Sequence, residues 1–119
     1  MKLITAIIRP ERLEAVEEAL REILDEGDNF RLTVDTVEGH GRQEGEVELF
    51  RGKLVRVRRV QKSRITLAVN DAYLEKSIAA ILKGARSGEA GVVGDGKIFV
   101  TALEECVRIR TGERGGTAV

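Results

Sequence analysis

The segment GVVGDGKI, residues 91–98, has the residue types that bind anions. Neighbouring glycine N–H groups can form a concave anion site, and Lys97 places a positive charge beside it. The segment fits the first seven positions of the phosphate-loop pattern G-x-x-x-x-G-K-[ST], but Ile98 replaces the hydroxyl residue that holds Mg²⁺. It also leads into a strand pattern and not into a helix, so we do not expect a conventional phosphate loop. A flexible turn before a strand-initial lysine is the alternative interpretation.

Two arginines, Arg108 and Arg110, alternate along the segment CVRIR and would lie on one face of a short strand. Two guanidinium groups on one side of a strand repel each other unless an acid or an anion lies between them. Their planar shape suits phosphate oxygens. An exposed edge strand protected by charge is the competing interpretation.

The connection at 39–61 is too long for a structureless loop inside a compact domain. Loops beyond about 12–15 residues are usually functional or disordered. This one begins GHGRQEG, and the overlapping stretch 51–64 holds seven basic residues and no acidic one. A charged arm of this kind is better suited to gripping a partner protein than to catalysis.

Few residues in the sequence suit catalysis or metal binding. His40, the only histidine, lies between two glycines without a second histidine or a cysteine pair, so we interpret it as a loop residue and not as a metal ligand. Asp95 is the only candidate base beside the GDGK segment, and it has no evident activating partner. Turn formation is its ordinary role. The sequence therefore favours a binding protein over an enzyme.

The composition narrows the function classes further. The 119 residues suit one domain, and the 20 basic residues balance 20 acidic ones, so the whole molecule does not attract nucleic acid. The absence of Trp, with one Tyr and three Phe, removes an aromatic platform for stacking bases. One cysteine excludes an internal disulfide, and there is no apolar run of membrane-spanning length and no signal-peptide pattern. We expect a soluble, cytoplasmic protein without direct membrane insertion.

The spacing of apolar residues predicts the elements that position these loops. Apolar residues recur at helical spacing from Pro10 to a stop at Gly27, and again after Asn70 or Asp71, either of which can cap the second helix. Short β-branched and apolar runs predict strands. The expected strands are 2–9, 30–38, 64–70, 97–103 and a short extra one at 106–110.

The predicted order is that of an α+β, ferredoxin-like βαββαβ sandwich with one long loop. Both helices should pack on one face of an antiparallel sheet. The other, apolar face is left without cover, which predicts an oligomer.

Four segments in register resemble the nitrogen-regulatory PII signal-transduction proteins: TVDTVEGHGRQEG (33–45), ELFRG (48–52), GDGKIFV (94–100) and RIRTGE (108–113). The resemblance runs over essentially the whole chain. It implies a single PII-like domain, residues 1–119, in a homotrimer of ferredoxin-like subunits with ATP or ADP in each inter-subunit cleft. The family's T-loop would be about 39–61, its B-loop about 87–97 and its C-loop about 108–113.

The resemblance also assigns roles to single residues. Thr33 would lie near the adenine, and Gln43 and Lys62 match positions that help to hold Mg²⁺ and pair with the carboxylate of the effector 2-oxoglutarate. A carboxylate beside a nucleotide needs such a cation. The nucleotide contacts would come from the base of the T-loop, from the B-loop around the phosphates, and from the C-loop of the neighbouring subunit: Gly39, Gly41 and Arg42; Gly94, Asp95, Gly96 and Lys97; Arg108 and Arg110.

For the target, the resemblance implies a transporter or a nitrogen-metabolism enzyme that is bound through the T-loop. Arg51 matches the arginine that ammonium-transporter regulators insert into the channel mouth, and Phe50 lies beside it at the loop tip. Basic residues of the far arm, Arg56, Arg58 and Arg59, would add contacts to an acidic surface.

The sequence departs from the family pattern at several points. Val55 and Lys53 replace the modifiable tyrosine and serine, which speaks against covalent switching of the known kinds. Thr66 replaces an expected glutamate near the adenine, and extra residues appear around 25–29 and within 90–93. These departures leave an alternative open: a PII-like sensor of another small ligand, such as bicarbonate or AMP and ADP, that regulates a different transport system.

Overall fold

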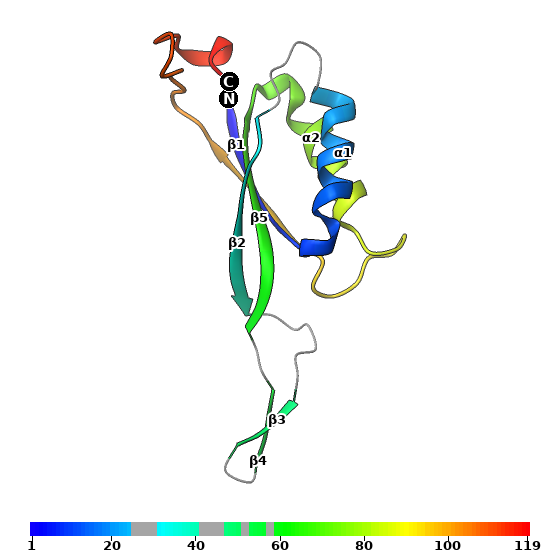
Figure 1. Ribbon diagram of the computed structural model, residues 1–119. Helices are drawn as coiled ribbons and strands as arrows, with labels where there is room; N and C mark the ends of the chain where they lie inside the picture. The colour runs from blue at the N-terminus through cyan, green and yellow to red at the C-terminus, as the bar shows by residue number, and fades with distance from the viewer. Residues whose placement is uncertain (25–30, 41–46, 51–52, 57–58) are drawn as a thin grey trace.

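The computed structural model describes residues 1–24, 31–40, 47–50, 53–56 and 59–119 (Figure 1). Two α-helices, α1 (Leu13–Leu24) and α2 (Leu74–Ala85), each follow a short 3-10 helix, η1 (Pro10–Arg12) and η2 (Asp71–Tyr73). A third 3-10 helix, η3, spans Gly115–Thr117. The strands are β1 (Lys2–Ile8), β2 (Thr33–His40), β3 (Val47–Phe50), β4 (Lys53–Arg56), β5 (Arg59–Val69) and β6 (Gly96–Ala102).

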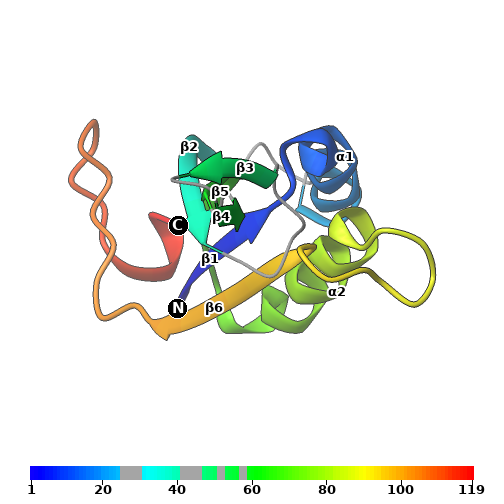
Figure 2. The ribbon, with the colours of Figure 1, turned by 90° about the horizontal axis from the view of Figure 1, so that it is seen from below.

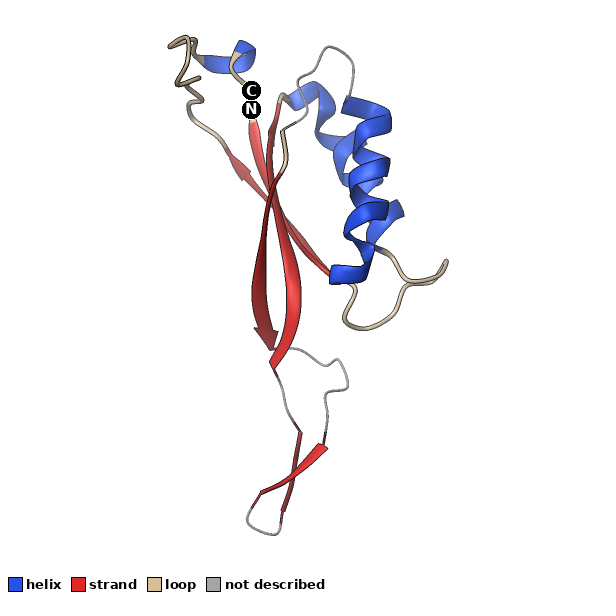
Figure 3. Ribbon diagram, in the orientation of Figure 1, coloured by secondary structure: helices blue, strands red, loops and turns tan. Residues whose placement is uncertain are grey.

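Four strands form one antiparallel sheet in the order β2-β5-β1-β6. The central strand β1 pairs with β5 (Ile4 opposite Leu67) and with β6 (Ile4 opposite Val100). The two helices form a second layer on one side of the sheet, as Figures 2 and 3 show. This strand order and the two-layer arrangement confirm the predicted ferredoxin-like α+β fold.

The core lies between the sheet and the helices. Alternate residues of β1 and β5 point into it, because side chains change face at every residue of a strand. They are joined by apolar residues of both helices, and Gly84 of α2 lies so close to α1 that a Cβ there would stand 2.6 Å from the Cα of Val16. The buried hydrophobic set is Ile4, Ala6, Ile8, Val16, Ala19, Leu20, Ile65, Leu67, Val69, Ala80, Ile81 and Ala85.

The opposite face of the sheet has no covering layer among the described residues. Thr5 of β1 lies opposite Phe99 of β6 on this face, and Phe99 is 52 % exposed. Leu3 and Ile7, on the same face, are half-buried. The expected uncovered apolar face is therefore present.

The long connection is shorter than the sequence predicts, because β2 continues to His40 and β5 begins at Arg59. The two strands remain paired as far as His40 opposite Arg59. Between them, β3 and β4 form a separate antiparallel hairpin, which lies beyond the end of the main sheet in Figure 1. The pairing of β2 with β5 extends into the segment predicted as a loop, because backbone hydrogen bonds between antiparallel strands do not depend on the side chains that suggested a loop.

The extra strand predicted at 106–110 is wrong. The chain turns here instead: the Gly112 N–H donates to Arg108 O at 2.7 Å, and the Arg108 N–H donates to Glu113 O at 2.9 Å. One isolated bridge, between Val107 and Arg114, is the only β pairing of this segment within the described part of the chain. Arg108 and Arg110 therefore do not share the face of a strand.

The prediction that the side chain of Asn70 or Asp71 caps the second helix is also wrong. Asn70 precedes η2, but its side chain forms no capping hydrogen bond. Its Nδ2 donates instead to Gly116 O at 3.1 Å, and Asp71 accepts a hydrogen bond from the N-terminal ammonium group at 2.9 Å. Both side chains instead form hydrogen bonds with residues that lie far away in the sequence.

Candidate functional site

A cavity of about 540 Å³ lies on the uncovered side of the sheet, at the ends of four strands. β1 and β2 end beside it, and β5 and β6 begin there, next to the loop 86–95 that is drawn in yellow in Figure 1. Its size is within the usual range for small-molecule sites, about 300–1,000 Å³. The residues that line it are Ile7, Gly39, His40, Val60, Lys62, Val93, Gly94, Gly96, Lys97 and Phe99.

The lining combines positive and apolar groups. Two lysines, Lys62 and Lys97, and the histidine His40 contribute nitrogen atoms, and none of the described lining residues is acidic. Ile7 and the exposed ring of Phe99 supply apolar surface. Cationic groups beside an aromatic ring suit a ligand that carries both an anion and a flat apolar part.

Two glycines determine the shape of the cavity wall. Gly94 and Gly96 have φ values of 100° and 113°, which side-chain-bearing residues rarely adopt. A Cβ on Gly96 would stand 1.7 Å from the carbonyl oxygen of Ile7, so β6 can approach β1 this closely only with glycine at its first position. The turn leads directly into Lys97, so glycine backbone and a cationic side chain line the same wall of the cavity, a combination that suits an anion.

Lys62 links the sheet to the glycine-rich loop. The residue is only 8 % exposed, and its Nζ donates a hydrogen bond to Gly94 O at 2.5 Å. Burial lowers the pKa of the Lys62 ammonium and the positive charge of Arg9 lowers it further, whereas Glu11 and Asp95 oppose this change. An anion bound in the cavity would stabilise the charged form of the Lys62 ammonium and so oppose the lowering of its pKa.

The Asp95 side chain does not line this cavity but is bound within the loop itself. Its Oδ2 accepts hydrogen bonds from the backbone N–H groups of Ser87 (2.9 Å) and Val92 (2.8 Å), and its Oδ1 accepts one from Arg9 Nε (3.0 Å). Burial alone would raise the pKa of the Asp95 carboxyl, but these hydrogen bonds outweigh it and hold the pKa well below its usual range. Of the turn role and the nucleotide role considered for Asp95, the geometry favours the turn role.

The structure brings five of the predicted nucleotide-site residues to the cavity: Gly39, Lys62, Gly94, Gly96 and Lys97. Thr33 lies at the far end of β2, six positions before Gly39 and opposite Thr66, and is not among the lining residues. Strand geometry puts it roughly 20 Å from Gly39.

Several predicted residues lie outside the described part of the chain: Gly41, Arg42, Gln43, Arg51 and Arg58. Phe50 is the last residue of β3 and Arg56 the last of β4. Arg59 begins β5, where its Nη1 lies 3.7 Å from Glu38 Oε2 of the paired strand.

The two C-loop arginines lie far from this cavity within one chain. The C-terminal segment is at the opposite end of the sheet from the loop 86–95 (Figure 1). Arg108 donates there from Nη2 to Thr117 O at 3.0 Å, and its Nη1 is 3.4 Å from Glu113 Oε1. Arg108 and Arg110 can act at the cavity only if a second copy of the chain supplies them.

Other lining residues were not predicted. His40, interpreted from the sequence as a loop residue, is the last residue of β2 and lines the cavity, so that interpretation is wrong. Ile7, Val60, Val93 and Phe99 line it too. Nothing in their local sequence indicated this, because the sheet order decides which strand ends and loops meet.

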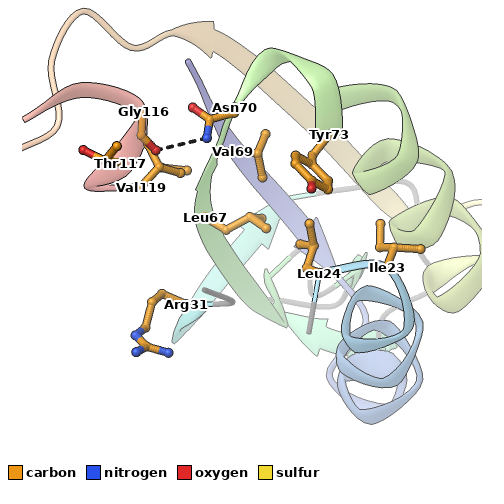
Figure 4. Close-up of a pocket in the computed structure, with 11 residues that line it drawn as sticks. Ile23, Leu24, Arg31, Leu67, Val69, Asn70, Tyr73, Gly116, Thr117 and Val119 are labelled. Atoms are coloured by element: carbon orange, nitrogen blue, oxygen red, sulfur yellow. Dashed lines mark hydrogen bonds between the residues drawn. The ribbon is translucent and has the colours of Figure 1, made fainter. Parts of the chain in front are cut away.

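A second, smaller hollow of about 150 Å³ lies at the other end of the molecule. Figure 4 shows it between the end of α1, the end of β5 and the C-terminal turn, with the Asn70–Gly116 hydrogen bond on one side. The ring of Tyr73 and the side chain of Leu24 form part of its wall. Its volume is below the usual range for a site of nucleotide size.

The described residues show neither a membrane-spanning helix nor a metal cluster. No helix among them is long and apolar enough to cross a bilayer. No group of three or more His, Cys, Asp or Glu side chains among them is placed to hold a metal ion.

Comparison with known proteins agrees with this architecture. The sequence model of the nitrogen regulatory protein P-II family matches residues 1–113. The chain is 49 % identical over 119 residues to a nitrogen regulatory protein P-II of Rhodospirillum rubrum, with all of both chains aligned. It is 46 % identical to the nitrogen regulatory protein GlnK1 of Methanosarcina mazei, over the whole of this chain and 97 % of the relative. To GlnK of Escherichia coli K12 it is 44 % identical over the full length of both.

These matches confirm the resemblance found from the four sequence segments. They also support the prediction of a regulator rather than an enzyme, because proteins of this family transmit signals and do not catalyse a reaction. The chain belongs to the P-II family of nitrogen regulatory signal-transduction proteins.

Proposed function

We propose that this protein is a nucleotide-dependent regulator that binds ATP or ADP in the cavity at the strand ends and controls a target protein through its T-loop segment, 39–61. The cavity lining is the observation that carries the proposal. Lys62, Lys97 and the glycine turn suit the phosphates, and Phe99 and Ile7 offer apolar surface to the rest of the nucleotide.

The proposal includes a homotrimer with the nucleotide in each inter-subunit cleft. The cavity lies on the sheet face that has no covering layer, so a second copy packed on that face would also close the cavity. Arg108 and Arg110, which cannot reach the cavity within one chain, would then come from the neighbour. Light scattering should give about three times the mass of one chain, and a clean monomer would contradict the shared site.

Carboxylate sensing is the second part of the proposal. Lys62 is buried, cationic and directed at the cavity wall, so it suits the carboxylate of 2-oxoglutarate beside a bound nucleotide. Mg²⁺ would be held by the nucleotide phosphates and by Gln43, which lies outside the described residues.

Calorimetry with ATP, ADP and AMP, each with and without 2-oxoglutarate and bicarbonate, tests the ligand. ATP or ADP binding that 2-oxoglutarate strengthens would support the proposal. A response to bicarbonate, or binding of AMP and ADP without ATP, would instead favour a sensor of another small ligand.

The variant Lys97→Ala should weaken ATP binding by about 1.5–3 kcal/mol, the range for a hydrogen bond to a charged group. Unchanged binding would support the alternative interpretation, in which the GDGK segment is only a flexible turn.

The target is proposed to be a transporter or a nitrogen-metabolism enzyme with an acidic surface, bound in the cytoplasm. The stretch 51–64 has seven basic residues and no acidic one, so capture should weaken as salt screens the charges over about 8–10 Å. Replacing Arg56, Arg58 and Arg59 by Ala should abolish capture in a pull-down and leave ATP affinity unchanged. Normal capture by this variant would shift attention to Phe50 and Arg51.

A further inference from the structure

We propose that Arg9 and Asp95 are positioning residues that hold the enlarged loop 86–95 in its binding shape before a ligand enters the cavity. The inference rests on the proposed function. Neither residue is among those that line the cavity, so both would act on the ligand through the loop backbone.

The first observation is the convergence of loop contacts on one carboxylate. Asp95 accepts hydrogen bonds from Ser87 N and Val92 N, eight and three positions earlier in the chain. These bonds close the loop into a ring, and the Asp95 N–H adds a turn bond to Val92 O at 3.1 Å. The residues within 90–93 that enlarge the loop are thereby enclosed in the ring.

The second observation is the anchor from the sheet. Arg9 follows the last residue of β1, and its guanidinium donates from Nε to Asp95 Oδ1 (3.0 Å) and from Nη2 to Val93 O (2.9 Å). The two side chains are 14 % and 18 % exposed, so solvent weakens this ion pair much less than an exposed one. The planar fork presents donors on two separate nitrogens to the two acceptors, an arrangement that the single ammonium nitrogen of a lysine does not reproduce.

The third observation connects this cluster to the cavity. Val93 and Gly94 line the cavity, and both carbonyl oxygens are held by cations: Val93 O by Arg9, and Gly94 O by Lys62. Fixing these peptides also fixes the direction of the backbone N–H groups that follow. A preformed loop spares the ligand the entropic cost of ordering it.

The variant Asp95→Asn separates a positioning role from a purely electrostatic one. Removing a negative charge near an anion site would, by charge alone, tighten ATP binding. Asparagine keeps only one acceptor oxygen, so it cannot accept from the loop N–H groups and from Arg9 at once. Losing one of these contacts would weaken ATP binding, and we expect binding about tenfold weaker, as the loss of one charge-assisted hydrogen bond implies. Calorimetry with ATP on the full chain gives the sign directly, and binding equal to or tighter than that of the parent would overturn the proposal.

Hydrogen exchange of the ligand-free protein gives a readout that does not depend on nucleotide binding. In Asp95→Asn the backbone amides of Ser87 and Val92 should exchange faster, while those of β1 and β5 keep their protection. The matched control is Glu22→Gln, which removes the exposed 3.8 Å pair between Glu22 and Lys83 and should leave both readouts unchanged. Unchanged exchange at Ser87 and Val92 would overturn the proposal, whereas parent protein that fails to bind ATP would overturn the proposed function alone.

Arg9→Lys provides a second test if Asp95→Asn does not fold. It keeps the positive charge but loses the fork, so exchange at Val92 should rise and ATP binding should weaken severalfold. Arg9→Lys with parent-like exchange and affinity would contradict the role of the fork.

Discussion

The carbonyl oxygen of Ile7 and the α-carbon of Gly96 approach so closely that no side chain fits between them. A Cβ on Gly96 would stand 1.7 Å from this oxygen, at a residue whose φ is 113°. The contact joins the end of β1 to the start of β6. It therefore fixes the point at which the glycine-rich loop enters the sheet and the cavity wall begins.

Gly96→Ala should lower the free energy of unfolding by more than about 2 kcal/mol, because the strained φ and the clash with backbone add together. Urea denaturation measures the loss. Gly112→Ala is the matched control: Gly112 also has a positive φ, 73°, but a Cβ there meets nothing within 4 Å. The unfolding free energy of Gly112→Ala should fall only by the cost of placing alanine at a positive φ, about 1–2 kcal/mol. Equal losses in the two variants would show that the Ile7 contact adds nothing.

Ser77→Ala should raise the stability of the protein. The Ser77 hydroxyl in α2 is fully buried and has no hydrogen-bond partner within the described part of the chain. Removing an unsatisfied buried hydroxyl should add about 1 kcal/mol, and alanine also favours the helix. Ala79→Ser, on the exposed face of the same helix, measures the helix-propensity difference alone. A gain at position 77 no larger than the loss at position 79 would contradict the burial argument.

Asp95 should make a pH-dependent contribution to stability. Its folded-state pKa lies below the unfolded value of about 3.9, so the folded protein binds fewer protons and the ionised carboxylate stabilises it. The difference in unfolding free energy between the parent and Asp95→Asn should be constant from about pH 7 to pH 5 and shrink below about pH 4. Urea titrations across this range measure it, with Glu22→Gln as the control. A difference that grows in acid would reverse the assigned direction.

Lys97→Ala and Arg108→Ala should each weaken ATP binding by about 1.5–3 kcal/mol and should complement one another when mixed. In a randomly mixed trimer, about a quarter of the clefts would pair an intact Lys97 with an intact Arg108 of the neighbour. The two variants are unfolded, mixed and refolded together, and calorimetry with ATP then counts these sites. The mixture would recover no sites if both residues acted within one chain, and that result would exclude the shared cleft.

Local patterns in the sequence were sufficient for the fold class and for the glycine-rich turn that lines the cavity. Helical spacing after Pro10 and strand patterns such as 64–70 depend on neighbours a few residues apart, so they can be read without the tertiary structure. The glycines of GDGK indicated a backbone turn, and Gly94 and Gly96 indeed have positive φ values. Lys97, chosen from the same segment, lines the cavity.

The tertiary structure decided which residues meet, because those contacts join distant parts of the chain. Arg9 binds a carboxylate 86 positions away, and nothing around Arg9 in the sequence indicates that partner. His40 entered the cavity because β2 pairs with β5 to its last residue. The segment 106–110 lost its predicted strand because it forms a turn instead of pairing with a neighbouring strand. Sequence periodicity determines which face of an element is apolar, whereas the sheet order determines what that face and its ends contact.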